Sequence, residues 1–309
     1  MKTDIPVLLI AWRRTDTLQR VIHSLRMVAP RNVFLACDGP HADRPEEVAM
    51  VSRVREMLLR EIDWPCQVEK KFSASNEGCQ RAVGGAVDWF FKSVQEGIIL
   101  EDDCVPHPDF FPFCSDLLEK YRHEERVGCI TGDNFQDGLR RGNGSYYFSK
   151  YPHCWGWATW RRAWEKYSPP IEFWPEWRTS KEWLHFFNDS KERCYWEGLF
   201  DKQYAGTIDS WAYPWTASLW KAGSLTATPQ KNLVQNVGFG REATHTKGTE
   251  QRLSIPTEKL RILLHPDKIQ PNHQADRYVF EHVFCNEKKD SNRGVRRFIQ
   301  FVRSIFSRN

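Results

Sequence analysis

Short apolar runs alternate with longer amphipathic stretches through the first 131 residues, and this alternation most constrains how the chain can fold. Five runs are predicted as strands, namely Ile5–Ala11, Asn32–Cys37, Gln67–Phe72, Gly97–Leu100 and Arg126–Thr131. The intervening stretches predict helices over about Thr15–Met27, Pro45–Ile62, Asn76–Val94 and Pro108–Arg122. Strands that alternate with helices of this length predict an α/β fold, with a mostly parallel central sheet flanked by helices.

Acidic residues follow three of these predicted strands. Asp38 follows the second strand, Glu101-Asp102-Asp103 ends the fourth, and Asp133 comes after the fifth. In open sheets of this kind, ligands bind outside the carboxyl ends of the strands. The sequence therefore predicts a ligand site at that edge of the sheet, which is called the carboxyl edge below.

Glu101, Asp102 and Asp103, called the acidic motif below, are followed by Pro106 and Pro108, which end the strand. Clustered carboxylates repel one another unless a cation joins them. Mn²⁺ or Mg²⁺, held by one or two carboxylates and by substrate phosphates, would do so and would stabilise a departing diphosphate. Neighbouring side chains on a strand point to opposite faces, so one of Asp102 and Asp103 should bind the metal and the other a ribose or metal-bound water. The alternative is a capping cluster for the next helix.

Other polar residues near the carboxyl edge each allow two interpretations. Asp38 could accept a hydrogen bond from a base N–H such as that of uracil, or could be an ordinary turn aspartate. Asn76 and Arg81 stand at a helix N-terminus, which suits phosphate, although an ordinary helix cap is the alternative. Arg13 and Arg14 follow the first strand. Arginine suits planar recognition of a base or diphosphate, and one of the two is expected to be solvated.

The second half of the chain is rich in tryptophan and proline. Trp155-Gly156-Trp157 combines two flat rings with a glycine that permits close approach of the backbone. The rings could stack on a sugar, and Trp211 could do the same, but packing in the core is an equally good explanation for such rings.

An inverting sugar transfer needs a general base to take the proton of the acceptor hydroxyl. Asp209, beside Trp211, has the chemistry for this role. Four glutamates compete with it on chemistry alone, namely Glu172, Glu176, Glu182 and Glu197. His245 could supply an imidazole to a metal, although a lone histidine is more often structural.

Charge and cysteine content exclude several classes of protein. The net charge is +4, and residues 286–309 alone hold seven Lys/Arg and two Asp/Glu, so the body of the chain is about neutral and unlike a nucleic-acid binder. Nine cysteines occur without CxxC zinc spacing, which favours a reducing compartment. Residues 292–309 place apolar and basic side chains on different sides of a helical wheel. This pattern predicts a basic amphipathic helix on an anionic membrane surface or one docked on the domain.

The ordered set of motifs resembles the GT-A fold glycosyltransferases, in particular N-acetylglucosaminyltransferase I and its relatives, and is also similar to bacterial family-2-like transferases. The matching residues run from Ile5 to His245. They are Arg13, Cys37-Asp38-Gly39, the acidic motif leading into Pro108-Asp109-Phe110-Phe111, Thr131-Gly132-Asp133-Asn134, Trp155-Gly156-Trp157 with Trp164, Asp209 beside Trp211, and Phe239-Gly240 followed by Thr244-His245.

This resemblance implies a role for several residues. It implies Asp103 as the direct metal ligand, Arg13 and Asp38 near the base, and Asp209 as the inverting catalytic base. It also implies Gly156 and Trp157 near the transferred sugar. Together with the residue chemistry, it gives a donor site, an acceptor site and a metal site. The donor residues are Arg13, Asp38, Asn76, Arg81, Asp102, Asp133, Gly156 and Trp157, the acceptor residues Trp155 and Trp211, and the metal ligands Asp103, Glu101 and His245.

The expected organisation is a GT-A, Rossmann-like domain over 1–250, with a nucleotide-binding half at 1–135 and an aromatic-rich acceptor-side half at 136–250, followed by an extension at 251–309. The expected activity is inverting transfer of a sugar from a UDP-sugar to a glycan or lipid-linked glycan, dependent on Mn²⁺ or Mg²⁺. We expect a cytoplasmic protein on the inner face of a membrane, without a nucleic-acid partner.

Two other functions fit parts of the pattern. A sugar nucleotidyltransferase shares the sheet and the carboxylate-bound metal, but it usually needs a glycine-rich phosphate loop near the N-terminus, and none follows the first predicted strand. A non-catalytic carbohydrate-binding protein would use the tryptophan-rich half and would have no need for three carboxylates at one strand end.

Overall fold

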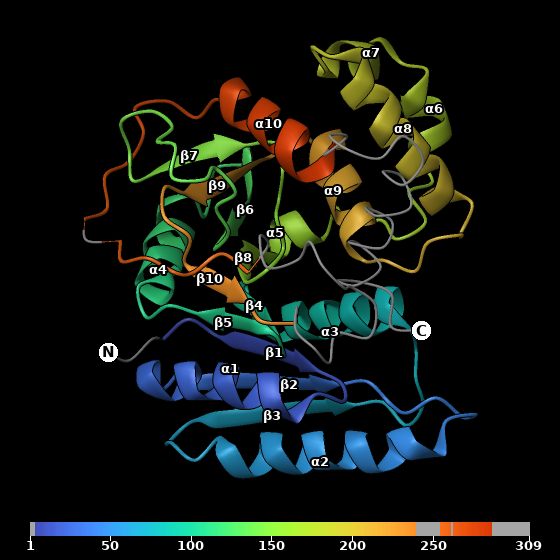
Figure 1. The fold of residues 1–309 in the computed structure, drawn as a ribbon, viewed down its shortest axis with the longest axis vertical. Helices are drawn as coiled ribbons and strands as arrows, with labels where there is room; N and C mark the ends of the chain where they lie inside the picture. Colours follow the sequence, from blue (N-terminus) through green and yellow to red (C-terminus); the bar gives the residue numbers. More distant parts are fainter. Residues whose placement is uncertain (1–3, 239–253, 261, 286–309) are drawn as a thin grey trace.

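The computed structural model describes residues 4–238, 254–260 and 262–285, which form an α/β fold around a large mixed sheet (Figure 1). The sheet has eight strands in the order β3-β2-β1-β4-β8-β6-β9-β7. Its strands are β1 (Val7–Ala11), β2 (Asn32–Cys37), β3 (Gln67–Phe72), β4 (Glu96–Glu101), β6 (Val127–Thr131), β7 (Tyr146–Ser149), β8 (Trp157–Trp160) and β9 (Leu225–Pro229). A second sheet pairs β5 (Cys104–Pro106) with β10 (Val234–Asn236).

Most neighbouring strands of the large sheet run in the same direction. Within the described ranges, β1 pairs in parallel with β2 and β4, β2 with β3, and β6 with β9. Strand β8 is antiparallel to both β4 and β6, and β7 is antiparallel to β9. Strand β6 therefore runs in the direction of β4, and the strands β1, β2, β4 and β6 all end at the carboxyl edge. The predicted fold class, a mostly parallel sheet flanked by helices, is confirmed.

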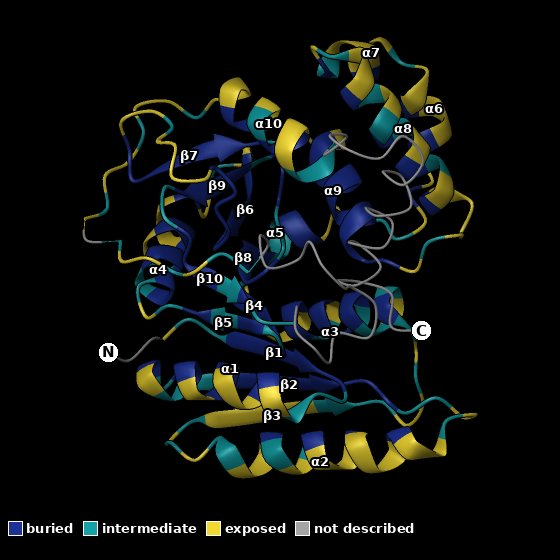
Figure 2. Cartoon of the chain, viewed as in Figure 1, coloured by how far each residue is buried: buried dark blue, intermediate teal, exposed yellow. Residues whose placement is uncertain are grey.

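The central strands are buried on both faces, and their sequences are therefore continuous apolar runs. Each residue of β1 is at most 2% exposed, which requires that both faces of the strand be covered. Strand β3 lies at the edge of the sheet, and its polar residues Glu69, Lys70 and Lys71 leave it partly exposed, as Figure 2 shows.

Amphipathic helices cover this sheet. In the first half these are α1 (Thr15–Val28), α2 (Pro45–Glu61), α3 (Cys79–Ser93) and α4 (Phe110–Lys120). Helix α1 buries Leu18, Val21, Ile22 and Leu25 as its spacing predicts. Helices α1 and α2 pack on each other, and α3 packs on β1 and β2. Among helices of the described residues, none is long and apolar enough to cross a membrane.

The second half packs aromatic rings upon one another. Its helices are α5 (Arg161–Trp164), α6 (Trp174–Arg178), α7 (Lys181–Phe186), α8 (Ser190–Tyr204), α9 (Ala212–Lys221), α10 (His273–Val279) and the π-helix η2 (Phe280–Phe284). Trp174, Trp177 and Trp183 are at most 1% exposed and meet edge to face with centroids 4.8–6.1 Å apart. These three tryptophans therefore build an aromatic core among α6, α7 and α8.

The pairing of β10 with β5 in the small sheet places residues 234–238 next to the acidic motif. Strand β10 pairs antiparallel with β5, with Asn236 opposite Cys104. The backbone nitrogen of Val237 then donates a hydrogen bond to the carbonyl oxygen of Asp103 at 2.8 Å. Residues 234–238 therefore lie beside the acidic motif, although they follow it by more than a hundred positions in the sequence.

Candidate active site at the carboxyl edge

The register of the parallel strands brings polar residues of the first half together. Ala11 of β1 is opposite Cys37 of β2, and Ile10 is opposite Glu101 of β4. The residues that follow these three strands are therefore neighbours at the carboxyl edge. Asp38, the acidic motif and the loop after β1 meet there, as the alternation of strands and helices predicts.

Asp102 and Asp103 differ sharply in exposure. Asp102 is fully buried, and its Oδ2 accepts a hydrogen bond from the backbone nitrogen of Trp12 at 3.1 Å. The side chain of Asp103 keeps 15% of its surface exposed. The two aspartates therefore have different surroundings, and their separate roles stay a prediction.

Arg14 donates hydrogen bonds to both of these aspartates. Its Nη2 lies 3.0 Å from Oδ1 of Asp102 and 2.6 Å from Oδ2 of Asp103. Burial opposes the charged form of Arg14, but the two carboxylates outweigh it and raise the pKa of the guanidinium above its usual value. In the structure, the guanidinium of Arg14 therefore offsets the repulsion within the acidic motif.

Asn236 also contacts the acidic motif, and sequence reasoning missed it. Its Nδ2 lies 3.5 Å from Oδ1 of Asp103, and its Oδ1 accepts a hydrogen bond from the backbone nitrogen of Gly238 at 2.8 Å. Asn236 is 3% exposed, so the pairing of β10 with β5 fixes its position. A short polar strand far along the chain gives no local signal that it returns to the acidic motif.

Asp103 has the donor chemistry for a divalent cation. Besides its contact with Arg14, it has an Oδ1 that meets a weak donor, the Cys104 sulfur at 3.4 Å, and the distant Nδ2 of Asn236. The described residues hold no group of three or more His, Cys, Asp or Glu side chains that could bind a metal. A cation at Asp103 would therefore take its other ligands from phosphate and water, as Mg²⁺ commonly does.

The roles of Glu101 and His245 as further metal ligands stay predictions. Glu101 is the last residue of β4 and is 6% exposed. Burial raises the pKa of the Cys104 and Cys154 thiols, and the charge of Glu101 adds to both shifts. His245 lies outside the described residues.

The structure separates the two arginines that follow β1. Arg13 turns away from the acidic motif, with Nη1 2.6 Å from Oε1 of Glu47 on α2 and its guanidinium 4.2 Å from the ring centroid of Trp12. The side chain of Arg13 is 19% exposed and that of Arg14 is 33% exposed. The expectation that one arginine is solvated is therefore wrong, because carboxylates hold both.

Asp38 fixes the loop that precedes α3. Its carboxylate accepts hydrogen bonds from the backbone nitrogens of Gly39 (2.8 Å) and Glu77 (3.0 Å) and from Nδ2 of Asn76 (2.9 Å). The predicted helix start at Asn76 is therefore wrong, because Asp38 holds this segment outside the helix. Helix α3 begins at Cys79 instead. Arg81, in its first turn, is exposed.

Asp209 reaches the same loop from the second half of the chain. Its two carboxylate oxygens each lie 2.8 Å from a backbone nitrogen, Oδ2 from that of Cys79 and Oδ1 from that of Gln80. These are the first amides of α3, which have no partner within the helix. Residues 76–80 therefore connect Asp38 at the carboxyl edge with Asp209.

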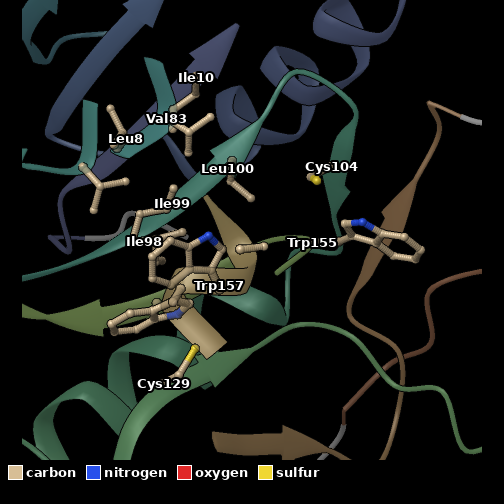
Figure 3. Close-up of a cluster of buried hydrophobic side chains, with 14 of the residues drawn as sticks. Leu8, Ile10, Val83, Ile98, Ile99, Leu100, Cys104, Cys129, Trp155 and Trp157 are labelled. Atoms are coloured by element: carbon tan, nitrogen blue, oxygen red, sulfur yellow. The ribbon is translucent and has the colours of Figure 1, made fainter. Parts of the chain in front are cut away.

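Trp157 and Trp211 are parts of the core. They are 1% and 0% exposed and stack on each other with centroids 5.3 Å apart. In Figure 3 the ring of Trp157 lies among the buried side chains near Ile98 and Ile99, whereas Trp155 lies apart. The predicted sugar-stacking role does not fit such burial, because side chains exposed by 1% or less leave no room for a sugar on the ring. Trp155 is 5% exposed and packs edge to face on Phe135.

Gly156 and Asp133 shape the backbone beneath the carboxyl edge. Gly156 has a positive φ of 68°, and a Cβ there would lie 2.7 Å from Cγ2 of Val234 in β10. Oδ2 of Asp133 accepts a hydrogen bond from the Trp155 nitrogen at 2.9 Å, and its buried Oδ1 has no hydrogen-bond partner among the described residues. Burial raises the pKa of the Asp133 carboxyl well above its usual range. Neither residue is placed to contact solvent directly.

The described residues thus define an α/β protein with a Rossmann-like sheet and a polar site at its carboxyl edge. No protein-family model matches the chain, and no curated protein sequence does. Among solved structures, a cytidylyltransferase from Leptospira borgpetersenii serovar Hardjo-bovis is 13% identical, with a TM-score of 0.34 over 53% of this chain and 63% of that one. The chain therefore spans less than two thirds of the length of that protein.

Two further structures show similarly distant likeness. HddC from Yersinia pseudotuberculosis is 13% identical, with a TM-score of 0.32 over 56% of this chain and 86% of that one. The mannosyltransferase PcManGT from Pyrobaculum calidifontis, in complex with GDP-Man and Mn²⁺, is 11% identical, with a TM-score of 0.36 over 71% of this chain and 69% of that one. Similarity this low supports no functional argument, so a functional proposal must rest on the chain's own contacts.

Proposed function

We propose that this protein is an inverting glycosyltransferase that moves a sugar from a nucleoside diphosphate donor to a hydroxyl group of a glycan or lipid-linked glycan. The observation that carries the proposal is the partly exposed carboxylate of Asp103 at the end of the buried strand β4. It lies at the carboxyl edge, where sheets of this kind bind nucleotides, and beside an arginine that can contact phosphate.

The donor is proposed to lie across the ends of β1, β2 and β4. Asp38 is proposed to bound the base through the loop that it holds at Asn76, because its own carboxylate is 6% exposed and accepts hydrogen bonds from Gly39, Asn76 and Glu77. Arg14, not Arg13, is the arginine within reach of a diphosphate at Asp103, because Arg13 is paired with Glu47. A UDP-sugar is the preferred donor in this proposal, as the resemblance to the GT-A glycosyltransferases implies.

A divalent cation, Mn²⁺ or Mg²⁺, fits the donor chemistry of Asp103 and would supply neutralisation of the charge on the departing diphosphate. The chain's own contribution is the partly exposed carboxylate of Asp103 at the carboxyl edge. Asn236 limits the orientation of Asp103 from one side and Arg14 from the other.

Asp209 is proposed to take the proton of the acceptor hydroxyl. Inversion requires that the hydroxyl oxygen attack the anomeric carbon on the side opposite the diphosphate, while one base accepts its proton. Asp209 is exposed, and each of its oxygens accepts one amide hydrogen bond. An ionised carboxylate can accept about four hydrogen bonds, so Asp209 retains capacity for an acceptor hydroxyl.

A donor screen tests the proposal. Nucleotide release would be measured from UDP-, GDP- and TDP-sugars with Mn²⁺, in the wild type and in Asp103→Asn, which removes the charge and keeps the shape. We expect release from one donor class and a fall of about 10²-fold or more in the variant. The exposed Asp116→Asn on α4 is the matched control, and it should release nucleotide at the wild-type rate.

Other results would identify the rival functions. Release of pyrophosphate from a nucleoside triphosphate and a sugar phosphate would identify a sugar nucleotidyltransferase. Calorimetric binding of glycans, without binding of any nucleoside diphosphate in the presence or absence of Mn²⁺, would identify a carbohydrate-binding protein. Undiminished donor turnover in Asp103→Asn would remove the metal from the proposal.

A further inference from the structure

One positively charged side chain already occupies the position between the two aspartates of the acidic motif. A single nitrogen of Arg14, Nη2, contacts both Asp102 and Asp103. Hydrogen bonds between ionised groups are short and strong, and the 2.6 Å contact with Asp103 is of this kind. A divalent cation that approaches Asp103 must therefore compete with Arg14 for the same carboxylate.

The backbone around Arg14 is fixed while its side chain reaches solvent. Arg14 is the N-cap residue of α1 and follows the buried strand β1 closely. Its side chain is one third exposed, and Asp103 is also partly exposed. The guanidinium can therefore leave Asp103 by rotation about side-chain bonds without a change in the sheet or the helix.

Gly238 provides the space in which the guanidinium lies. A Cβ at this position would come within 2.9 Å of Nη1 of Arg14 and 2.4 Å of Oδ2 of Asp103. A side chain here would collide with the contact between the two residues. The segment after β10 is therefore compatible with Arg14 at Asp103 because residue 238 is a glycine.

We propose that Arg14 is a resident cation of the acidic motif, which a divalent metal displaces from Asp103 and which then binds the donor diphosphate. The inference rests on the proposed function, since it assigns regulation to the same site. In the free protein, the guanidinium offsets part of the negative charge of the acidic motif and weakens binding of metal alone. When metal and nucleoside diphosphate arrive together, the freed guanidinium can donate hydrogen bonds to the diphosphate in place of Asp103.

This exchange makes metal and nucleoside diphosphate bind cooperatively. Each ligand favours the state in which Arg14 has left Asp103, so each must raise the affinity for the other by the same factor. A permanent structural ion pair would give a different result. Arg14 would then affect the stability of the fold, and the affinity for metal alone would not depend on it beyond a general effect of charge.

The test measures Mn²⁺ binding by electron paramagnetic resonance, with and without UDP, GDP or TDP, in the wild type and in Arg14→Met. We expect Mn²⁺ alone to bind about tenfold or more tightly to Arg14→Met than to the wild type. The nucleoside diphosphate that binds the wild type with Mn²⁺ should bind the variant about tenfold or more weakly. The factor by which it raises Mn²⁺ affinity should therefore fall in the variant.

Two further variants keep the test decisive. Arg20→Met removes an equal charge from the exposed face of the same helix and should leave both affinities within about twofold of the wild type, because surface charges are screened by salt. Arg14→Gln removes the charge but keeps a hydrogen-bond donor, and it replaces Arg14→Met if thermal melting shows that the latter does not fold.

The possible results separate this inference from the proposed function. Equal Mn²⁺ affinity in the wild type, Arg14→Met and Arg20→Met, with nucleotide binding intact, overturns the exchange and leaves the glycosyltransferase standing. An equal gain in Arg14→Met and Arg20→Met also overturns it, since charge alone then explains the effect. Failure of the wild type and all variants to bind Mn²⁺ with UDP, GDP or TDP contradicts the metal-assisted function itself, and the exchange with it.

Discussion

Oδ2 of Asp209 lies 2.8 Å from the backbone nitrogen of Cys79, a residue 130 positions earlier in the chain. The carboxylate thereby sits at the N-terminus of α3, where unpaired amides and the helix dipole favour negative charge. Gly78, with a φ of 79°, permits this approach, because a Cβ there would lie 2.8 Å from the same oxygen. The candidate base of the second half is thus positioned by a helix of the first half.

Asp209→Asn should separate catalysis from helix capping. An asparagine can still accept one amide hydrogen bond through its oxygen but cannot take a proton from an acceptor hydroxyl. We expect kcat to fall by about 10²- to 10⁴-fold, with a small change in the KM for the donor. Steady-state nucleotide release in the presence of the acceptor, together with thermal melting, would measure both effects.

The matched control for that variant is Asp189→Asn. Asp189 is the N-cap of α8 and accepts a hydrogen bond from the nitrogen of Lys191 at 2.9 Å. Asparagine caps a helix about as well as aspartate, so this change should cost less than about 0.5 kcal/mol of stability and leave kcat unaltered. If Asp209→Asn behaves in the same way, Asp209 is a helix cap and the base lies elsewhere.

Asp38→Asn should weaken nucleotide binding. In the wild type, the backbone nitrogen of Glu77 and Nδ2 of Asn76 donate hydrogen bonds to the Asp38 carboxylate. In the variant, the amide nitrogen would take the place of an accepting oxygen and face such donors. We expect a loss of stability of about 1–3 kcal/mol and an affinity for UDP reduced about tenfold or more. Calorimetry at a temperature well below the midpoint of unfolding measures the affinity. Unchanged UDP affinity in a destabilised variant would show that Asp38 is a turn residue and not part of a base site.

Gly156→Ala should destabilise the pairing that holds Asn236 at the acidic motif. The substitution imposes a left-handed conformation on alanine and places its Cβ 2.7 Å from Val234 in β10. We expect a total cost of about 2–4 kcal/mol, of which the backbone accounts for about 1–2 kcal/mol. Denaturant unfolding measures this cost.

Gly206→Ala isolates the backbone part of the same effect. Gly206 also has a φ of 68°, but a Cβ there would have no neighbour within 4 Å among the described residues. Its replacement should therefore cost about 1–2 kcal/mol. Equal losses of stability in Gly156→Ala and Gly206→Ala would show that β10 moves to accommodate the added methyl group without a cost in free energy.

The sequence was sufficient to predict the first half of the fold. The strands Asn32–Cys37 and Gln67–Phe72 are confirmed residue for residue, because apolar or β-prone runs between turn residues carry their own signal. The strand β8 (Trp157–Trp160) was missed. Its tryptophans suit a sugar platform as well as a core, and the choice between the two depends on its insertion between β4 and β6.

The site was predictable where it depended on strand order and was not where it depended on long-range pairing. Asp38, Asp102 and Asp103 were placed correctly at the carboxyl edge, since parallel strands end on the same side. Whether Arg13 or Arg14 meets the acidic motif depends on side-chain direction at the start of α1. Asn236 could not be found from the sequence, because only the pairing of β10 with β5 brings it to Asp103.

Asp276→Asn should make the protein more stable at neutral pH and remove part of its pH dependence. Burial raises the pKa of Asp276 from 3.8 to about 6, although its Oδ1 accepts a hydrogen bond from Ser149 at 2.6 Å and Lys150 opposes the shift. A carboxyl whose pKa is raised on folding contributes stability that is fully present below pH 3.8 and lost as the pH rises through about 6.

Asparagine keeps an acceptor for Ser149 without a charge. The stability of the variant relative to the wild type should therefore increase by about 1.4 kcal/mol between about pH 5 and about pH 8, by urea unfolding. A difference that stays constant over this range would show that Asp276 ionises in the folded protein as freely as in the unfolded chain.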